Sequence, residues 1–231
     1  MNALETAGVP SLLARQLERR ERERAALART LHDELCGQLV AARMLVARLL
    51  EPLSRRATDV ERIGLEDVER QLATAITINR RIVERLRPGL LDHFGLPTAL
   101  KALFEAQGRD AGLEVAVQLP QEPLELSPEA GICLYRVAEE ALDNVVKHAQ
   151  ASRVELQVVH QATRCVMTLR DNGVGFDPSQ LQGLHTVGLP LIREWLGALG
   201  GGLALTAAPG SGVCLVASLP LAATLRAPAD S

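Results

Sequence analysis

The chain has few aromatic residues, few cysteines and no excess of basic residues. One Trp, one Tyr and three Phe in 231 residues disfavour a surface that stacks nucleic-acid bases. With 25 Lys and Arg against 28 Asp and Glu, the sequence also lacks the basic field of a nucleic-acid binder, so we expect no direct nucleic-acid partner. The four cysteines form no CxxC pair, and we expect buried thiols in a reducing compartment.

Long hydrophobic runs are absent as well. No stretch approaches the ~18–20 apolar residues that a membrane helix needs. The N-terminus lacks the basic start and apolar core of a signal peptide. Taken as a whole protein, the chain is therefore expected to be soluble and cytoplasmic, with no membrane segment.

Residues 11–87 predict two long amphipathic helices, with Pro52 as the single interior proline. Apolar residues recur at helical spacing in the first helix, at Leu27, Leu31, Leu35, Leu39, Ala42, Val46 and Leu49. A second helix is expected over 58–86. Because a lone hairpin cannot bury both apolar stripes, pairing with a second copy into a four-helix bundle is the simplest solution. Packing of the hairpin on its own second domain is the alternative.

The rest of the chain predicts an α+β sandwich, a mixed sheet with helices on one face. The expected elements are helices at 98–110, 127–149 and 189–199, and strands at 113–119, 153–159, 164–170, 203–207 and 212–219. The expected division is an N-terminal helical extension (1–20), the hairpin domain (21–90), the sandwich domain (91–222) and a tail (223–231).

A His-Asp pair lies in the middle of the first helix, in Leu31-His32-Asp33-Glu34-Leu35. A neutral imidazole at its solvent edge is a competent nucleophile toward a phosphoryl group. Asp33 can accept a hydrogen bond from one ring nitrogen or take its proton. Alone, the dipeptide is more typical of an ordinary surface histidine.

A second set of polar residues shares one helix face, because Glu140, Asn144 and His148 are four residues apart. The amide oxygen of Asn144 suits Mg²⁺, and Lys147 and His148 can meet phosphate oxygens. Flanking apolar residues predict a half-buried helix. Polar groups near a buried face need partners, so these residues are less typical of an ordinary exposed helix surface.

Glycines follow the strand at 164–170, in Asp171-Asn172-Gly173-Val174-Gly175-Phe176. Gly173 and Gly175 permit a tight backbone and close ligand approach, while the Asp171 carboxylate can accept a hydrogen bond from an exocyclic amine such as that of adenine. Two further glycine groups, at 183–188 and 210–212, predict a mobile cover over a phosphate-bearing ligand.

Together these motifs resemble those of a sensor histidine kinase. The segments EALDNVVKHA, DNGVGF and HTVGL (185–189) are similar to the asparagine box and the two glycine boxes of the ATP-binding domain shared with gyrase and mismatch-repair ATPases. The segments ARTLHDELCGQL and LRPGLLDHFGLPTALKAL resemble the dimerisation and phosphoacceptor domain of the nitrate-sensor and thermosensor subfamily. The resemblance covers about residues 20–220, with the boxes in family order.

The resemblance implies a role for each matching residue. His32 would be the phosphoacceptor, Asp33 its neighbouring acid/base, and Glu140 the catalytic-helix carboxylate. The implied nucleotide contacts are Asn144 through Mg²⁺, Asp171 on adenine, Gly173 and Gly175 in its turn, Lys147 and His148 near the phosphates, and Gly188 and Leu189 beside the ATP lid. The implied protein is a homodimer that phosphorylates His32 from ATP. It then passes the phosphoryl group to an aspartate of a response regulator receiver domain, usually one with a helix-turn-helix output domain.

Some positions depart from the family pattern. The subfamily often carries a Gln five residues after the histidine, where it positions water for phosphatase action; here Gly37 stands there and Gln38 is one further on. One residue turns a side chain ~100° around an α-helix, unless a local bulge restores the register. In the lid, Thr186 and Val213 replace a usual Gly and Thr. These lid changes leave open a non-catalytic phosphotransfer or scaffold protein with a degenerate nucleotide domain. A serine-kinase-type regulator is a third alternative, which the His-Asp hairpin disfavours.

Overall fold

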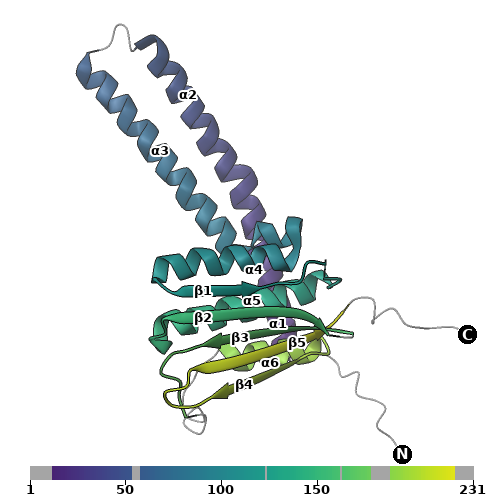
Figure 1. The fold of residues 1–231 in the computed structure, drawn as a ribbon. Coiled ribbons are helices and arrows are strands. Elements are labelled where there is room, and N and C mark those ends of the chain that lie inside the picture. Colours follow the sequence, from purple (N-terminus) through teal and green to yellow (C-terminus); the bar gives the residue numbers. More distant parts are fainter. Residues whose placement is uncertain (1–11, 54–57, 123, 162, 178–187, 222–231) are drawn as a thin grey trace, which may run out of the picture. The chain divides into compact units, whose positions relative to one another are not determined.

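The computed structural model describes residues 12–53, 58–122, 124–161, 163–177 and 188–221. These residues form two compact units, one over residues 19–89 and the other from the residues before and after that stretch (Figure 1). The predicted tail, and most of the predicted cover at 183–188, lie outside the described residues.

The first unit is a helical hairpin. Its elements are α1 (Leu12–Thr30), which begins before the unit, η1 (Leu31–Cys36), α2 (Gly37–Leu53) and α3 (Asp59–Leu86). The second long helix is confirmed, and its observed start is one residue after the predicted one. It begins with a reciprocal cap, in which the Thr58 hydroxyl accepts from the Glu61 N–H at 3.4 Å and the Glu61 carboxylate accepts from the Thr58 N–H at 3.0 Å. The Thr58 hydroxyl also donates to the Glu61 carboxylate at 2.8 Å; this hydrogen bond, and then the one from the Thr58 N–H, lowers the pKa of Glu61.

The first long helix differs from the expected continuous α-helix, because η1 is a π-helical turn. A π turn carries one residue more than an α turn, and such turns are frequent at functional sites. The hairpin leaves much of the predicted apolar stripe uncovered: Leu27, Leu35 and Leu49 are 50%, 41% and 54% exposed. The single hairpin therefore does not bury its own stripe.

The second unit is the predicted α+β sandwich. Its elements are α4 (Gly89–Ala111), β1 (Glu114–Gln118), α5 (Pro128–Asn144), η2 (Val145–Ala149), β2 (Arg153–Gln161), β3 (Arg164–Asp171), α6 (Gly188–Ala198), β4 (Gly202–Ala207) and β5 (Val213–Pro220). The five strands lie in the order β1-β2-β3-β5-β4, with β1 parallel to β2 and the other pairs antiparallel. Helices α5 and α6 pack on the sheet (Figure 1).

Apolar residues at alternating positions of the strands form one side of the core of this unit. Val154, Leu156 and Val158 of β2 are at most 1% exposed, as their spacing predicts for one face of a strand. The opposing layer comes mainly from α5, of which most residues are buried, and from Trp195 of α6. The C-terminal part of α5 is less buried, and the polar residues Glu139, Glu140, Asp143 and Asn144 are half-buried there.

One helix begins earlier than expected. The pattern predicts a helix over 98–110, whereas α4 starts at Gly89 and contains a break at Gly95, whose φ is 77°. Pro97 then falls in the first turn after the break, where a missing N–H costs no helical hydrogen bond.

No described helix combines the length and apolar character that crossing a membrane requires.

Candidate functional site

Helix α5 presents the predicted polar face. It starts at Ser127, whose hydroxyl accepts from the Ala130 N–H at 3.1 Å, with Pro128 at the first position. Ala141 and Val145 are buried, whereas Glu140 and Asn144 are half-buried, one turn apart. The carboxylate and the amide are therefore held on a rigid helix and reach its solvent edge.

The helix ends in the π turn η2, which carries Lys147 and His148, both exposed. The Lys147 ammonium pairs with the Asp143 carboxylate at 2.6 Å. The hydrogen bond to Asp143, then its charge, and to a smaller extent the charge of Glu140, raise the pKa of Lys147. Lys147 is thus a cation at neutral pH, and an incoming phosphate would compete with Asp143 for it.

The turn after β3 lies against the end of η2. Asp171 is 3% exposed, and its Oδ1 accepts from the Gly173 N–H at 2.8 Å. A Cβ on Gly173 would collide with the Ala149 backbone, whose carbonyl accepts from the Val174 N–H at 2.8 Å. Glycine is required at position 173 because these two segments touch.

The β4–β5 connection closes on the same turn. Gly175 has a φ of 59°, and a Cβ there would collide with the carbonyls of Ala208 and Gly212. Gly212, with a φ of 70°, leaves no room for a Cβ against the Asp171 backbone. The sequence predicted residues 210–212 only as part of a mobile cover over the ligand, whereas in the structure Gly212 packs against the Asp171 backbone.

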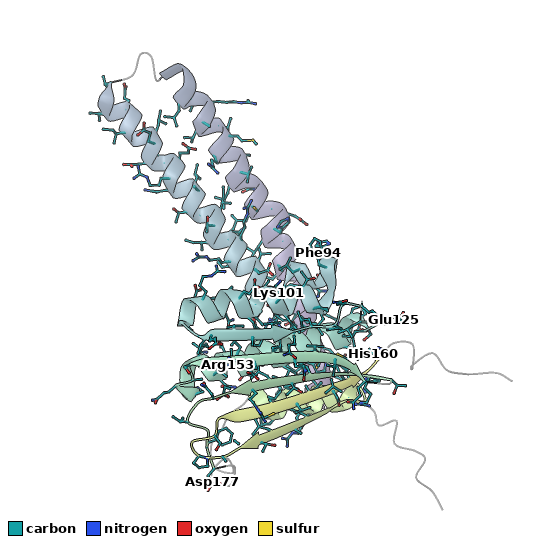
Figure 2. All side chains as sticks on the ribbon, viewed as in Figure 1. Phe94, Lys101, Glu125, Arg153, His160 and Asp177 are labelled. Carbon is teal, nitrogen blue, oxygen red and sulfur yellow. The ribbon has the colours of Figure 1, made fainter. Side chains whose placement is uncertain are left out.

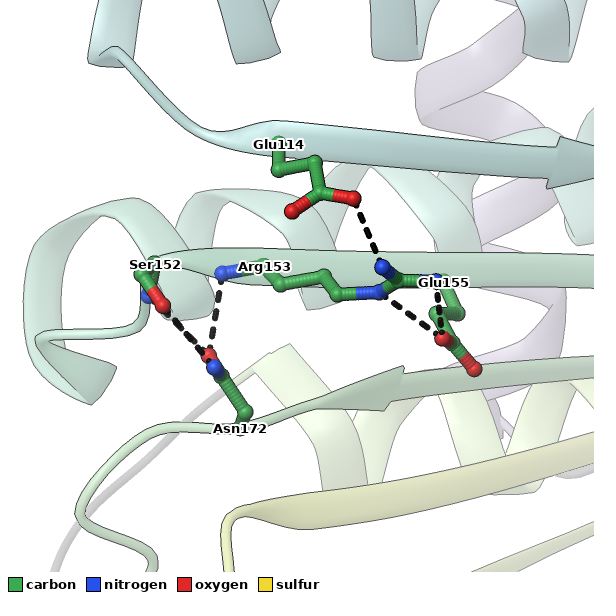
Figure 3. A network of polar contacts seen from close by, with 5 residues as sticks. All are labelled: Glu114, Ser152, Arg153, Glu155 and Asn172. Carbon is green, nitrogen blue, oxygen red and sulfur yellow. Dashed lines mark hydrogen bonds and ion pairs between the residues drawn. The ribbon is translucent and has the colours of Figure 1, made fainter.

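Asn172 was not among the predicted site residues, yet it anchors this turn to the sheet (Figure 3). Its Oδ1 accepts from the N–H groups of Ser152 and Arg153 at 3.0 and 2.9 Å, and its Nδ2 donates to the Ser152 hydroxyl at 2.9 Å. Arg153, labelled in Figure 2, in turn pairs with Glu114 and Glu155. Ser152 and Arg153 lie 20 and 19 residues before Asn172, so the spacing of residues within one element does not predict these contacts.

The start of α6 completes the cluster. A Cβ on Gly188 would overlap the carboxylate of Glu140, so this glycine lies directly against the α5 face. Leu189 follows in α6, with its side chain outside the described residues, as are His185 and Thr186. The structure thus brings the predicted residues from α5, η2, the post-β3 turn and α6 into one region.

His32 and Asp33 lie in the helical unit. Both are exposed on η1, which agrees with the expected solvent-edge position of the imidazole.

The side-chain oxygens of Glu140 and Asn144 are suited to a Mg²⁺ ion that is shared with the phosphates of a nucleotide. Among the described residues no three His, Cys, Asp or Glu side chains cluster as a metal cage. A magnesium ion that is shared with phosphates needs only one or two protein oxygens, and Asn144 with Glu140 supplies oxygens of that type.

Two family models match the chain. Residues 130–223 match the model described as "Histidine kinase-, DNA gyrase B-, and HSP90-like ATPase", and residues 23–91 match the one described as "Histidine kinase". The sandwich therefore carries an ATP-binding domain of this ATPase class.

Curated relatives agree. The chain is 34% identical to the sensor histidine kinase MctS of Rhizobium johnstonii, over 92% of this chain and 46% of that protein. It is also 34% identical to the histidine-protein kinase/phosphatase UhpB of Salmonella typhimurium, over 90% of this chain and 41% of that protein. The chain thus spans somewhat less than half of each. A histidine kinase domain from Erythrobacter litoralis shares the fold, with a TM-score of 0.52 and 19% identity over 78% of this chain and 94% of that one. The chain belongs to the histidine kinases, in the nitrate-sensor-like group that its motifs predict.

Proposed function

We propose that the chain is a two-component histidine kinase that phosphorylates His32 from ATP and passes the phosphoryl group to a response regulator. In this proposal residues 21–90 are the dimerisation and phosphoacceptor domain, and residues 91–222 are the ATP-binding catalytic domain. The carrying observation is that one chain holds an exposed His32-Asp33 pair and the cluster of Glu140, Asn144 and Asp171. Nothing in the comparisons favours the degenerate alternative.

The chemistry at His32 is a phosphoryl transfer. One ring nitrogen attacks the γ-phosphorus, forming a P–N bond as the bond to the β–γ bridging oxygen breaks and ADP leaves. Asp33 accepts a hydrogen bond from the other ring nitrogen and takes up the proton, which keeps the attacking nitrogen's lone pair free. Glu140, on α5, is the carboxylate assigned to the catalytic helix.

The nucleotide contacts follow from the cluster. Asp171 has a carboxylate to accept from the adenine amine, and Lys147 and His148 offer donors to the phosphates. Asn144, with Glu140, would hold Mg²⁺. A bound Mg²⁺ would neutralise phosphate charge during the transfer. Gly188, and Leu189 after it, would border the lid.

The hairpin supports a homodimer. Its large apolar side chains are between 41% and 80% exposed at Leu27, Leu35, Met44, Leu45, Leu49, Val60, Ile63, Val68, Ile78 and Ile82. So many exposed large apolar side chains on one hairpin are typical of an interaction face, and a second hairpin provides a matching one. The other partner in the proposal is a receiver domain, with a helix-turn-helix output domain as the expected type.

The test is incubation of the protein with ATP and Mg²⁺, followed by measurement of acid-labile phosphate. We expect label on the wild type, none on His32→Ala, and strongly reduced label on Asp171→Asn. Absence of label on the wild type, or equal label on His32→Ala, would reject the proposal. Acid-stable label would instead support a serine kinase.

A specific observation favours phosphatase action as a second activity. The π turn η1 contains one residue more than an α turn. Gln38, six residues after His32, is therefore expected close to the angular position that the fifth residue after His32 has in a regular α-helix. Gln38 is also exposed. UhpB, a relative, is described as a kinase/phosphatase. We expect Gln38→Ala to slow dephosphorylation of a phosphorylated receiver domain while His32 is still labelled. Unchanged dephosphorylation would reject this role of Gln38.

A further inference from the structure

Asn79 is a buried polar residue on the inner face of α3. It continues the helical spacing of Leu72, Ile76, Val83 and Leu86, where an apolar residue is expected. Its exposed fraction is only 4%. Because a buried amide is unfavourable unless it is hydrogen-bonded, its presence on this face requires a reason.

The bond that Asn79 makes points to the reason. Its Nδ2 donates to the backbone carbonyl of Leu31 at 3.2 Å. Leu31 precedes His32 and is the first residue of η1, against which α3 packs. A π turn replaces the i→i+4 hydrogen bonds of an α-helix by i→i+5 hydrogen bonds, and the Asn79 amide adds a donor from a second helix at this turn.

The second half of the amide is not satisfied. Among the described residues, the buried Oδ1 of Asn79 has no hydrogen-bond partner. A leucine of similar size would avoid this cost. Stability of the hairpin alone therefore does not account for an amide at position 79.

We propose that Asn79 is a positioning residue that holds the η1 turn, and with it the His32 side chain, through its bond to the Leu31 carbonyl. This inference rests on the proposed function of His32. Asn79 does not contact the imidazole and acts through the backbone.

The test compares Asn79→Leu, which removes the amide, with Asn79→Asp, which keeps the shape but loses the donor. Thr77→Ala is the matched control, because the hydrogen bond of the Thr77 hydroxyl lies within its own helix, to the Ala73 carbonyl at 2.9 Å. We expect both Asn79 variants to slow His32 phosphorylation by roughly ten- to a hundredfold, as misplacement of a reacting group does. ATP affinity should not change, and the control should behave as the wild type.

Deletion of Gly37 separates positioning from general support of the hairpin. Gly37 directly follows η1, and its deletion removes the extra residue, so that an α turn can replace the π turn that Asn79 holds. In this background Asn79→Leu should change the rate by less than about twofold. Wild-type rates in both Asn79 variants, or an equal loss with and without Gly37, would overturn the inference.

Hydrogen exchange gives a readout that does not need activity. Asn79→Leu should speed exchange of the amides of residues 31–37 at least about tenfold, with the amides of α5 unchanged. If the wild type carries no phosphate on His32, the proposed function fails, while unchanged exchange at 31–37 rejects the role of Asn79 separately.

Discussion

Asp171, a residue of the proposed nucleotide site, and its neighbour Asn172 have different predicted roles, which makes the pair a sharp test of the site. Asp171 is buried behind the Gly173 and Gly212 backbone, with one carboxylate oxygen bonded to the Gly173 N–H. Asn172 is exposed, and its three hydrogen bonds tie the turn to Ser152 and Arg153. We expect Asp171→Asn to impair ATP binding and Asn172→Ala to impair stability.

The magnitudes follow from the bonds. Each net hydrogen bond contributes about 0.5–1.5 kcal/mol, and since water reaches Asn172 the lower value applies, giving a loss of about 1.5 kcal/mol for three bonds. For a domain of this size that loss lowers the unfolding midpoint by about 5 °C. In Asp171→Asn the amide oxygen can still accept from Gly173, so stability is nearly kept. The lost charged acceptor for adenine should weaken ATP binding by roughly ten- to a hundredfold.

The assay is thermal unfolding by circular dichroism together with calorimetric titration of ATP and Mg²⁺, on the full chain. Asn172→Asp is the control, since it keeps the acceptor oxygen and loses only the donor to the Ser152 hydroxyl; its midpoint should lie between those of the wild type and Asn172→Ala. If Asn172→Ala weakened ATP binding while its midpoint stayed at the wild-type value, the reasoning would be refuted.

Three further predictions follow from the same unit. Gly188→Ala should displace the Glu140 carboxylate and slow His32 phosphorylation on the order of tenfold, about 1.4 kcal/mol, while the unfolding midpoint moves little; an unchanged rate would contradict the contact. Ser127→Ala should cost about 1 kcal/mol in urea unfolding by removing the cap of α5, and Ser127→Asp should restore it. Burial raises the pKa of Cys165 to about 11. The unfolded thiol loses its proton first, so stability should fall by about 1 kcal/mol between pH 8 and pH 10, a fall that Cys165→Val should lack.

Much of the fold was predictable because its signals are local. The alternation at Val154, Leu156 and Val158 predicts a strand with one buried face, and Ser127-Pro128 predicts where α5 begins. Spacing also predicted that Glu140 and Asn144 share a face. Such patterns depend on residues close in sequence, which one helix or strand brings together by its own period.

Other features depend on segments that are far apart in sequence. The close approaches of Gly173 to Ala149 and of Gly188 to Glu140 arise only when the turn after β3 and the start of α6 pack against α5 and η2. Glycine there indicates a tight backbone, but not which neighbour requires it. Asn172 is similar, since its partners lie on β2.

The π turn at His32 shows why a helix cannot be interpreted alone. Without it, the extra residue before Gln38 would rotate all of α2 by ~100° and turn half-buried Leu39 and Val46 away from α3. Confining the extra residue to one turn preserves that packing. At this turn the Leu31 carbonyl accepts a hydrogen bond from the Asn79 amide of α3. The six-residue spacing from His32 to Gln38 and the polar residue on the inner face of α3 are therefore two parts of one structural solution.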